Sequence, residues 1–122
     1  MALDRARTGQ LGEEATCNLL RERGFELHAV NWRVGHYELD IVAEREGCLH
    51  IVEVKTRHAG SLTPPEAAAT PAKFRALKRA ANLYLSLSGW KGDVQFDLSA
   101  VEMFPDGECR VELIEEAFES HW

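Results

Sequence analysis

The chain has 122 residues, 45% of them hydrophobic and 28% charged, which predicts one globular domain over residues 1–122 and excludes a disordered or low-complexity chain. No stretch approaches the ~18 apolar residues of a membrane span, and the first ten residues lack a signal-peptide core, so we expect a cytoplasmic protein with no membrane contact. Three widely spaced cysteines, Cys17, Cys48 and Cys109, show no zinc-ligand pattern and predict free thiols.

The formal net charge of −6 is unevenly distributed along the chain. Residues 93–122 carry nine acidic residues and a single basic one, Arg110. Between Pro71 and Lys91, by contrast, there are five basic residues and no acidic one. The acidic total therefore does not exclude nucleic-acid binding, but any surface for it must be local.

The first predicted element is a helix over residues 8–23. Apolar residues recur at four-residue spacing from Leu11, and Gly24 stands where a glycine commonly ends a helix. Gly9 and Gly12 weaken its first turn, which indicates a close backbone approach or a need for space.

Three predicted strands follow, at residues 25–33, 37–43 and 50–56. Alternation predicts that each of the last two strands separates its side chains onto two faces. In the second strand one face holds Leu39, Ile41 and Ala43, and the other holds Glu38, Asp40 and Val42. In the third strand one face holds Val52 and Val54, and the other holds Ile51, Glu53 and Lys55.

The second half of the chain begins with a proline-containing loop at residues 58–70. Thr70 and Pro71 predict the start of a helix that Gly89 ends, and two strands follow at residues 93–101 and 109–114. The resulting order, α-β-β-β-α-β-β, predicts an α/β (α+β) fold with one central mixed β-sheet flanked by helices.

Four charged residues interrupt the two apolar strands: Glu38, Asp40, Glu53 and Lys55. Moving a carboxylate out of water costs on the order of several kcal/mol unless a nearby cation offsets the loss of hydration. If the strands form an antiparallel hairpin, Asp40 and Glu53 share a face with Lys55 nearby. Such oxygen ligands suit Mg²⁺ or Mn²⁺, and a lysine beside the metal suits phosphodiester hydrolysis. The alternative is a solvent-facing pair at a sheet edge, with Lys55 in an ordinary ion pair to Asp40.

Several segments resemble the YraN-like small bacterial proteins, a family of predicted endonucleases: TGQLGEEA, NWR, ELDIVA, IVEVKTR, PPEAAATPAKFRALKRAANLYL and VQFDLSAV. That family belongs to the PD-(D/E)XK nuclease superfamily and is similar to Holliday-junction resolvases. The resemblance extends from about Gly9 to Phe118. It implies a restriction-endonuclease-like core and a metal-dependent endonuclease for structured or branched DNA. A homodimer is a hypothesis, because cutting both strands of a junction needs two active centres.

The resemblance also implies roles for individual residues. Asp40 would be the central metal ligand, Glu53 the second carboxylate ligand, Lys55 the catalytic lysine and Glu13 the helix glutamate that helps complete the metal site. Glu38 is expected at the edge of the site. The chain departs from the family pattern in two places, where Tyr37 replaces a frequent glycine and Leu39 replaces the proline of the superfamily.

Residues outside this set have less specific predicted roles. The helix that follows Pro71 is expected either to place basic side chains on nucleic-acid phosphates or to present a solvated face; these side chains are Lys73, Arg75, Lys78 and Arg79. Gln95 and Asp97 share one face of their strand, and a structural role is preferred for them over a place near the site. Arg57, His36 and His58 are interpreted as phosphate contacts or solvated loop residues. The competing function is a nuclease-fold protein that binds nucleic acid or a partner protein without cutting.

Overall fold

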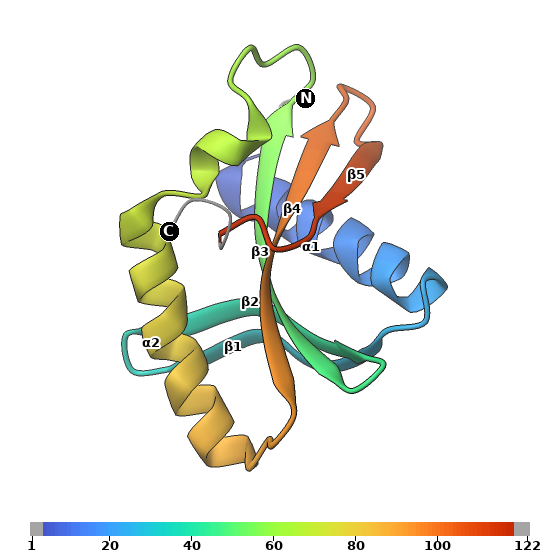
Figure 1. Ribbon diagram of the computed structural model, residues 1–122. Coiled ribbons are helices and arrows are strands. Elements are labelled where there is room, and N and C mark those ends of the chain that lie inside the picture. The colour runs from blue at the N-terminus through green and yellow to red at the C-terminus, as the bar shows by residue number, and fades with distance from the viewer. Residues whose placement is uncertain (1–3, 119–122) are drawn as a thin grey trace.

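The computed structural model describes residues 4–118 as a five-stranded sheet between two long helices (Figure 1). The elements in chain order are α1 (Arg5–Glu22), β1 (Glu26–Val34), β2 (Tyr37–Arg45), β3 (Cys48–His58), the short 3₁₀ helix η1 (Pro65–Ala68), α2 (Pro71–Ser88), β4 (Asp93–Met103) and β5 (Cys109–Ile114). This order confirms the predicted fold class. None of the helices within residues 4–118 is long and apolar enough to cross a membrane.

Capping residues set where the two long helices begin and end. α1 starts earlier than predicted, because the Asp4 carboxylate accepts a hydrogen bond from the backbone N–H of Arg7 at 2.8 Å. α2 starts where predicted, since the Thr70 hydroxyl accepts from the N–H of Lys73 at 3.1 Å. Gly89 ends α2 with φ of 74°, a left-handed conformation that favours glycine.

The strands lie side by side in sequence order, from β1 to β5. β3 and β4 are parallel and all other neighbours are antiparallel, so α2 forms the crossover between β3 and β4. Figure 1 shows α1 behind the sheet and α2 in front of it. Each helix buries its own core cluster: α2 packs on residues that include Val42, Ile51 and Leu98, and α1 packs on residues that include Ile41, Ala43 and Val52.

The clean two-face division predicted for the second strand is wrong at one position. Leu39 packs with Val42 in the α2 cluster, whereas Ile41 packs in the α1 cluster. The β1–β2 ladder pairs Val30 with Ile41 and Trp32 with Leu39 but skips Asn31, which has φ of 53°. Because a left-handed residue interrupts the regular pleat, alternation breaks at this point of the hairpin. Asp40 therefore lies at the break.

β2 and β3 form a fork. They pair up to Ile41 and Val52 and then separate, while β3 continues in its ladder with β4 as far as His58. Beyond the last pair, the Asp40 carboxylate accepts a hydrogen bond from the backbone N–H of Val54 at 2.8 Å. A side chain thus replaces a backbone partner at the point where the two strands part.

The two glycines of α1 have different surroundings. A Cβ at Gly12 would overlap the side chain of Thr56 on β3, whereas nothing lies within 4 Å of a Cβ at Gly9. The expected close approach is therefore confirmed for Gly12 alone, and it brings α1 against β3 beside the fork.

Candidate active site

The fork opens into a cleft of about 990 Å³. Its walls come from the first half of α1, from β2, from the end of β3 with the loop that follows, and from the first turn of α2. The cleft brings together the four residues that the sequence predicts as the metal and catalytic set: Glu13, Asp40, Glu53 and Lys55. Three separate elements therefore supply this set.

Asp40 and Glu53 form the electrostatic centre of the cleft. Glu53 is nearly buried, with 15% of its side chain exposed. Burial raises the pKa of Glu53 to about 7, and the nearby charge of Asp40 contributes to that increase. Lys73 acts in the opposite direction but does not cancel the effect. The positive charge of Lys73 is therefore too small to offset the burial of Glu53 and its repulsion by Asp40.

Glu13 joins this environment from α1. Its side chain is half-buried, and burial raises its pKa, with a further contribution from the charge of Asp40. The side chain of Asn31 opposes the increase. Glu13 thus interacts electrostatically with Asp40, as a third carboxylate of one site would.

Lys55 is exposed and lines the cleft two residues beyond Glu53. No ion pair within 4.0 Å joins it to a carboxylate in the part of the chain that the structure describes. The cross-strand pair with Asp40, which was the alternative interpretation, is not formed. Lys55 therefore lines the open cleft without a carboxylate partner among the described residues.

Lys73 points into the cleft and contacts Glu53. Its Nζ lies 3.0 Å from Glu53 Oε2. Burial lowers the pKa of the Lys73 ammonium, but Glu53 outweighs this and the net shift is upward. In the sequence analysis Lys73 was one of four basic residues on a helix face, and its ion pair with Glu53 was not predicted. The spacing of residues along a helix does not show which side chain will reach a distant strand.

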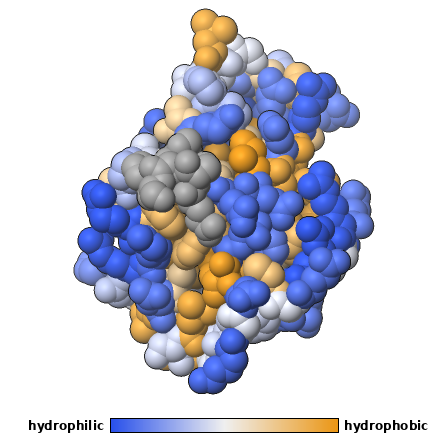
Figure 2. Space-filling model, in the orientation of Figure 1, coloured by the Kyte–Doolittle hydropathy of each residue, from blue (hydrophilic) through white to orange (hydrophobic). Residues whose placement is uncertain are grey.

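The other three basic residues of α2 do not line this cleft. The Lys78 ammonium lies 4.4 Å from the centre of the Phe74 ring, and Arg75 and Arg79 are exposed. Figure 2 shows hydrophilic side chains gathered along the outer side of α2. Of the four basic side chains of α2 that the sequence grouped together, Lys73 alone lines the cleft.

Other polar residues occupy the rim. Glu38 lines the cleft and pairs with Arg33 at 3.3 Å, with both side chains more than half exposed, which places it at the edge as expected. Arg57 and His58 also line the cleft, whereas His36 is exposed in the β1–β2 turn and does not. Rim pairs of this kind contribute about 0–1 kcal/mol to stability.

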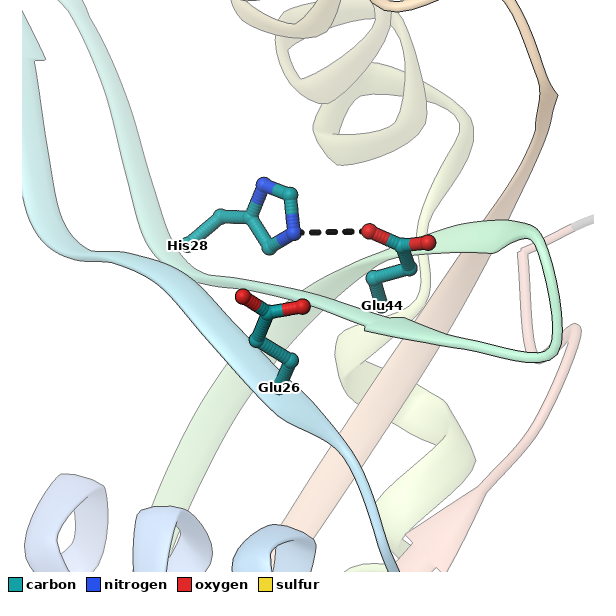
Figure 3. Close-up of side chains that lie close together, drawn as sticks. All are labelled: Glu26, His28 and Glu44. Carbon is teal, nitrogen blue, oxygen red and sulfur yellow. Dashed lines mark hydrogen bonds and ion pairs between the residues drawn. The ribbon is translucent and has the colours of Figure 1, made fainter.

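Two groups outside the cleft offer more tightly clustered metal ligands. In each, all three ligand atoms lie within 4.8 Å of one another, a condition that Glu13, Asp40 and Glu53 do not meet. One group is on the surface of the β1–β2 hairpin and consists of Glu26, His28 and Glu44 (Figure 3). There His28 Nε2 lies 2.9 Å from Glu44 Oε1, so a hydrogen bond already accounts for that contact. The other group is His50, Asp97 and Glu115.

The buried group is a structural network. His50 Nδ1 and Asp97 Oδ2 lie 2.6 Å apart, and Asp97 Oδ1 accepts from the Gln95 amide at 2.9 Å and from the N–H of Glu116 at 3.0 Å. Neither Gln95 nor Asp97 lines the cleft, which fits their interpretation as structural residues. The sequence did not single out His50, although its alternation with Val52 on an apolar face was a signal of burial.

A mixed sheet that forks around carboxylates of two adjacent strands, with one helix on each face, defines an α+β protein of the restriction-endonuclease-like class. The family model described as Uncharacterised protein family UPF0102 matches residues 12–114. The chain belongs to this family, which is the YraN-like family of the PD-(D/E)XK superfamily.

Relatives from distant bacteria share most of the chain. A UPF0102 protein of Oleidesulfovibrio alaskensis is 48% identical over 94 residues, which are 76% of this chain and 46% of that protein, so the chain spans less than half of this relative's length. A UPF0102 protein of Porphyromonas gingivalis is 40% identical over 90% of this chain and 82% of its own length. One of Symbiobacterium thermophilum is 41% identical over 92% and 96%. The names of these relatives state the family and no activity.

Proposed function

We propose that this chain is a divalent-metal-dependent endonuclease that hydrolyses phosphodiester bonds of structured or branched DNA. The observation that carries the proposal is the convergence of Glu13, Asp40, Glu53 and Lys55 on one open cleft. Carboxylates and a lysine at one site suit phosphoryl transfer to water, because the reaction develops negative charge on phosphate oxygens. Membership of the PD-(D/E)XK superfamily supports the same reaction class.

The carboxylates fit a hard divalent cation. Asp40 and Glu53 would hold Mg²⁺ or Mn²⁺, and Glu13 would complete the site directly or through water. Burial and the charge of Asp40 raise the pKa of Glu53, and a bound divalent cation would oppose that shift by stabilising the charged carboxylate. When bound, the ion would polarise the phosphodiester and neutralise charge that develops on it.

The chain's own groups would orient the reactants. The N–H of Val54 holds the Asp40 carboxylate at 2.8 Å, so that carboxylate is preorganised. Lys55 presents an exposed ammonium in the cleft, where it would orient the attacking water and stabilise negative charge on phosphorus. An open cleft at a strand fork also suits a polymer, which must enter from the side.

The direct test incubates the pure protein with branched, flapped and single-stranded DNA in Mg²⁺ or Mn²⁺. Asp40→Asn and Lys55→Ala should each lower the cleavage rate by roughly 100-fold or more. Lys91→Ala is the matched control, because Lys91 is exposed and lies outside the cleft. Cleavage that continues undiminished in both site variants would contradict the proposal.

A binding module that does not cut is the competing function. The Lys73–Glu53 ion pair favours it, because an internal cation already balances part of the site's charge. Calorimetry separates the two functions. An absence of Mn²⁺ binding, together with DNA binding that survives removal of both the Asp40 and the Glu53 carboxylates, would support the binding module.

Symmetric cleavage of a junction would also require a homodimer, since each strand needs its own active centre. Sedimentation velocity of the pure protein, alone and with branched DNA, tests this part of the proposal. A species that stays monomeric at high concentration and on DNA would contradict symmetric junction cleavage and would leave single-strand cleavage of structured DNA as the activity.

A further inference from the structure

The Lys73–Glu53 ion pair spans the cleft between two elements that are far apart in sequence. Lys73 lies in the first turn of α2 and Glu53 lies on β3, with 38% and 15% of their side chains exposed. Lys55, the lysine of the sequence motif, forms no ion pair within residues 4–118 although it is only two residues from Glu53. The cation that pairs with Glu53 therefore comes from α2.

We infer that Lys73 is a displaceable internal cation of the candidate metal site, which occupies Glu53 when no metal is bound and leaves when a divalent cation binds. The inference rests on the proposed metal site at Asp40 and Glu53. A divalent ion would bind a carboxylate oxygen at about 2.1 Å. An ammonium 3.0 Å from Oε2 of the same group occupies part of that oxygen's surroundings and repels the ion. Metal and Lys73 therefore compete for Glu53.

The structure provides both an anchor and room for this displacement. The N–H of Lys73 is held by the Thr70 hydroxyl at 3.1 Å at the start of α2, so the backbone can stay in place while the side chain moves. Lys73 and Glu53 both line the main cleft and an adjoining cleft of about 430 Å³, whose far wall includes Thr63 and Pro65. Rotation of the flexible side chain toward that far wall would separate the ammonium from Glu53.

A functional consequence follows for metal affinity. The carboxylates alone would attract a divalent ion strongly, whereas Lys73 lowers that affinity by the free energy of the ion pair that must be broken. The site would fill only when the ion concentration overcomes this competition. Lys73 thus sets the metal affinity without being a ligand.

The test is calorimetric titration of MnCl₂ into the full chain. Lys73→Met should bind Mn²⁺ roughly threefold to tenfold more tightly than the wild type, because the competing ion pair is gone. Lys78→Met is the matched control, since Lys78 lies on the same helix over Phe74 and should leave the affinity within about twofold. Lys73→Arg, which keeps the positive charge, should stay close to the wild type.

The outcomes separate this inference from the nuclease proposal. Mn²⁺ affinity that is unchanged or weaker in Lys73→Met than in Lys78→Met would overturn the inference, as would a failure of every variant to bind Mn²⁺. Tighter Mn²⁺ binding by Lys73→Met in a protein that cuts no DNA would support the inference and contradict only the nuclease activity. Lys73→Gln should act in the same direction as Lys73→Met and serves as a second variant if the latter does not fold.

Discussion

At the residue scale, Glu53 shows how its surroundings alter a carboxylate. Burial and the charge of Asp40 raise the pKa of Glu53 from its ordinary value of 4.5 to about 7. An acid whose pKa is raised on folding stabilises the fold below its unfolded pKa, and this contribution is lost as the pH rises through the folded pKa. The metal-free protein should therefore lose stability between pH 4.5 and about 7.

Replacing Glu53 with glutamine should accordingly stabilise the metal-free protein at high pH. We expect Glu53→Gln to raise the free energy of unfolding by about 1–3 kcal/mol near pH 8, because no charge is then buried, and to have little effect near pH 4. Urea unfolding in EDTA at both pH values measures this. Glu66→Gln, at an exposed carboxylate outside the cleft, should leave the stability unchanged at both. A destabilised Glu53→Gln at high pH would contradict the assigned cause of the shift.

Asp97 is a buried carboxylate with a different role, since hydrogen bonds surround it. His50, Gln95 and the N–H of Glu116 all contact its two oxygens. Asp97→Asn should destabilise the fold by about 2–4 kcal/mol, because an amide cannot accept from all these partners. Thermal and urea unfolding measure the loss. Asp93→Asn, at an exposed position of the same strand, is the control, and equal stability of the two variants would contradict this role.

At the element scale, the contact of α1 with β3 depends on Gly12, which has no side chain. A Cβ at Gly12 would overlap Thr56, whose Oγ1 is buried and makes no hydrogen bond within residues 4–118. This close contact brings the α1 segment that carries Glu13 up to the strand that carries Glu53. The position of one candidate ligand thus depends on helix packing as well as on its own side chain.

Substitution of Gly12 should reveal that packing. Gly12→Ala should lower the free energy of unfolding by about 1–3 kcal/mol, because overlap with β3 outweighs the better helix propensity of alanine. Gly9→Ala, where the space is open, should instead stabilise the protein by up to about 1 kcal/mol. Chemical denaturation compares the two. Adding Thr56→Ala should recover part of the loss in Gly12→Ala, and a Gly12→Ala variant as stable as Gly9→Ala would contradict the contact.

At the scale of the whole molecule, the fork places the carboxylate cleft beside the basic outer side of α2. The proposed DNA surface therefore requires only local positive charge, although the chain has a net charge of −6. Lys73 lies at the boundary, where it contacts both the cleft and the adjoining one. DNA that lies along α2 would therefore pass the cleft.

This arrangement predicts how charge removal affects DNA binding. Replacing both Arg75 and Arg79 with glutamine should weaken binding of every DNA structure to a similar extent and reduce the salt dependence of log K by about 2, one for each lost phosphate contact. Fluorescence anisotropy at several salt concentrations measures both effects. Arg110→Gln, in an ion pair with Glu102 at 3.8 Å, is the control. An unchanged slope in the double variant would exclude α2 as the DNA surface.

Local sequence patterns were enough to predict the element order, the start of α2 at Thr70 and Pro71, and the strands that carry Asp40, Glu53 and Lys55. These features follow from local rules, because capping, proline placement and strand periodicity act over a few residues. The resemblance to a family then supplied roles for the same residues. Glu13 could be included in the site only through that resemblance.

Which of these side chains come into contact depends on how the elements pack in three dimensions. The break in alternation at Asp40 coincides with the left-handed residue Asn31 on the neighbouring strand, and the network around Asp97 joins β3 to β4 through a parallel register. The ion pair between Lys73 and Glu53 depends on how α2 crosses the sheet. Such contacts join residues distant in sequence, so their geometry is set by packing of whole elements and leaves no local pattern in the chain.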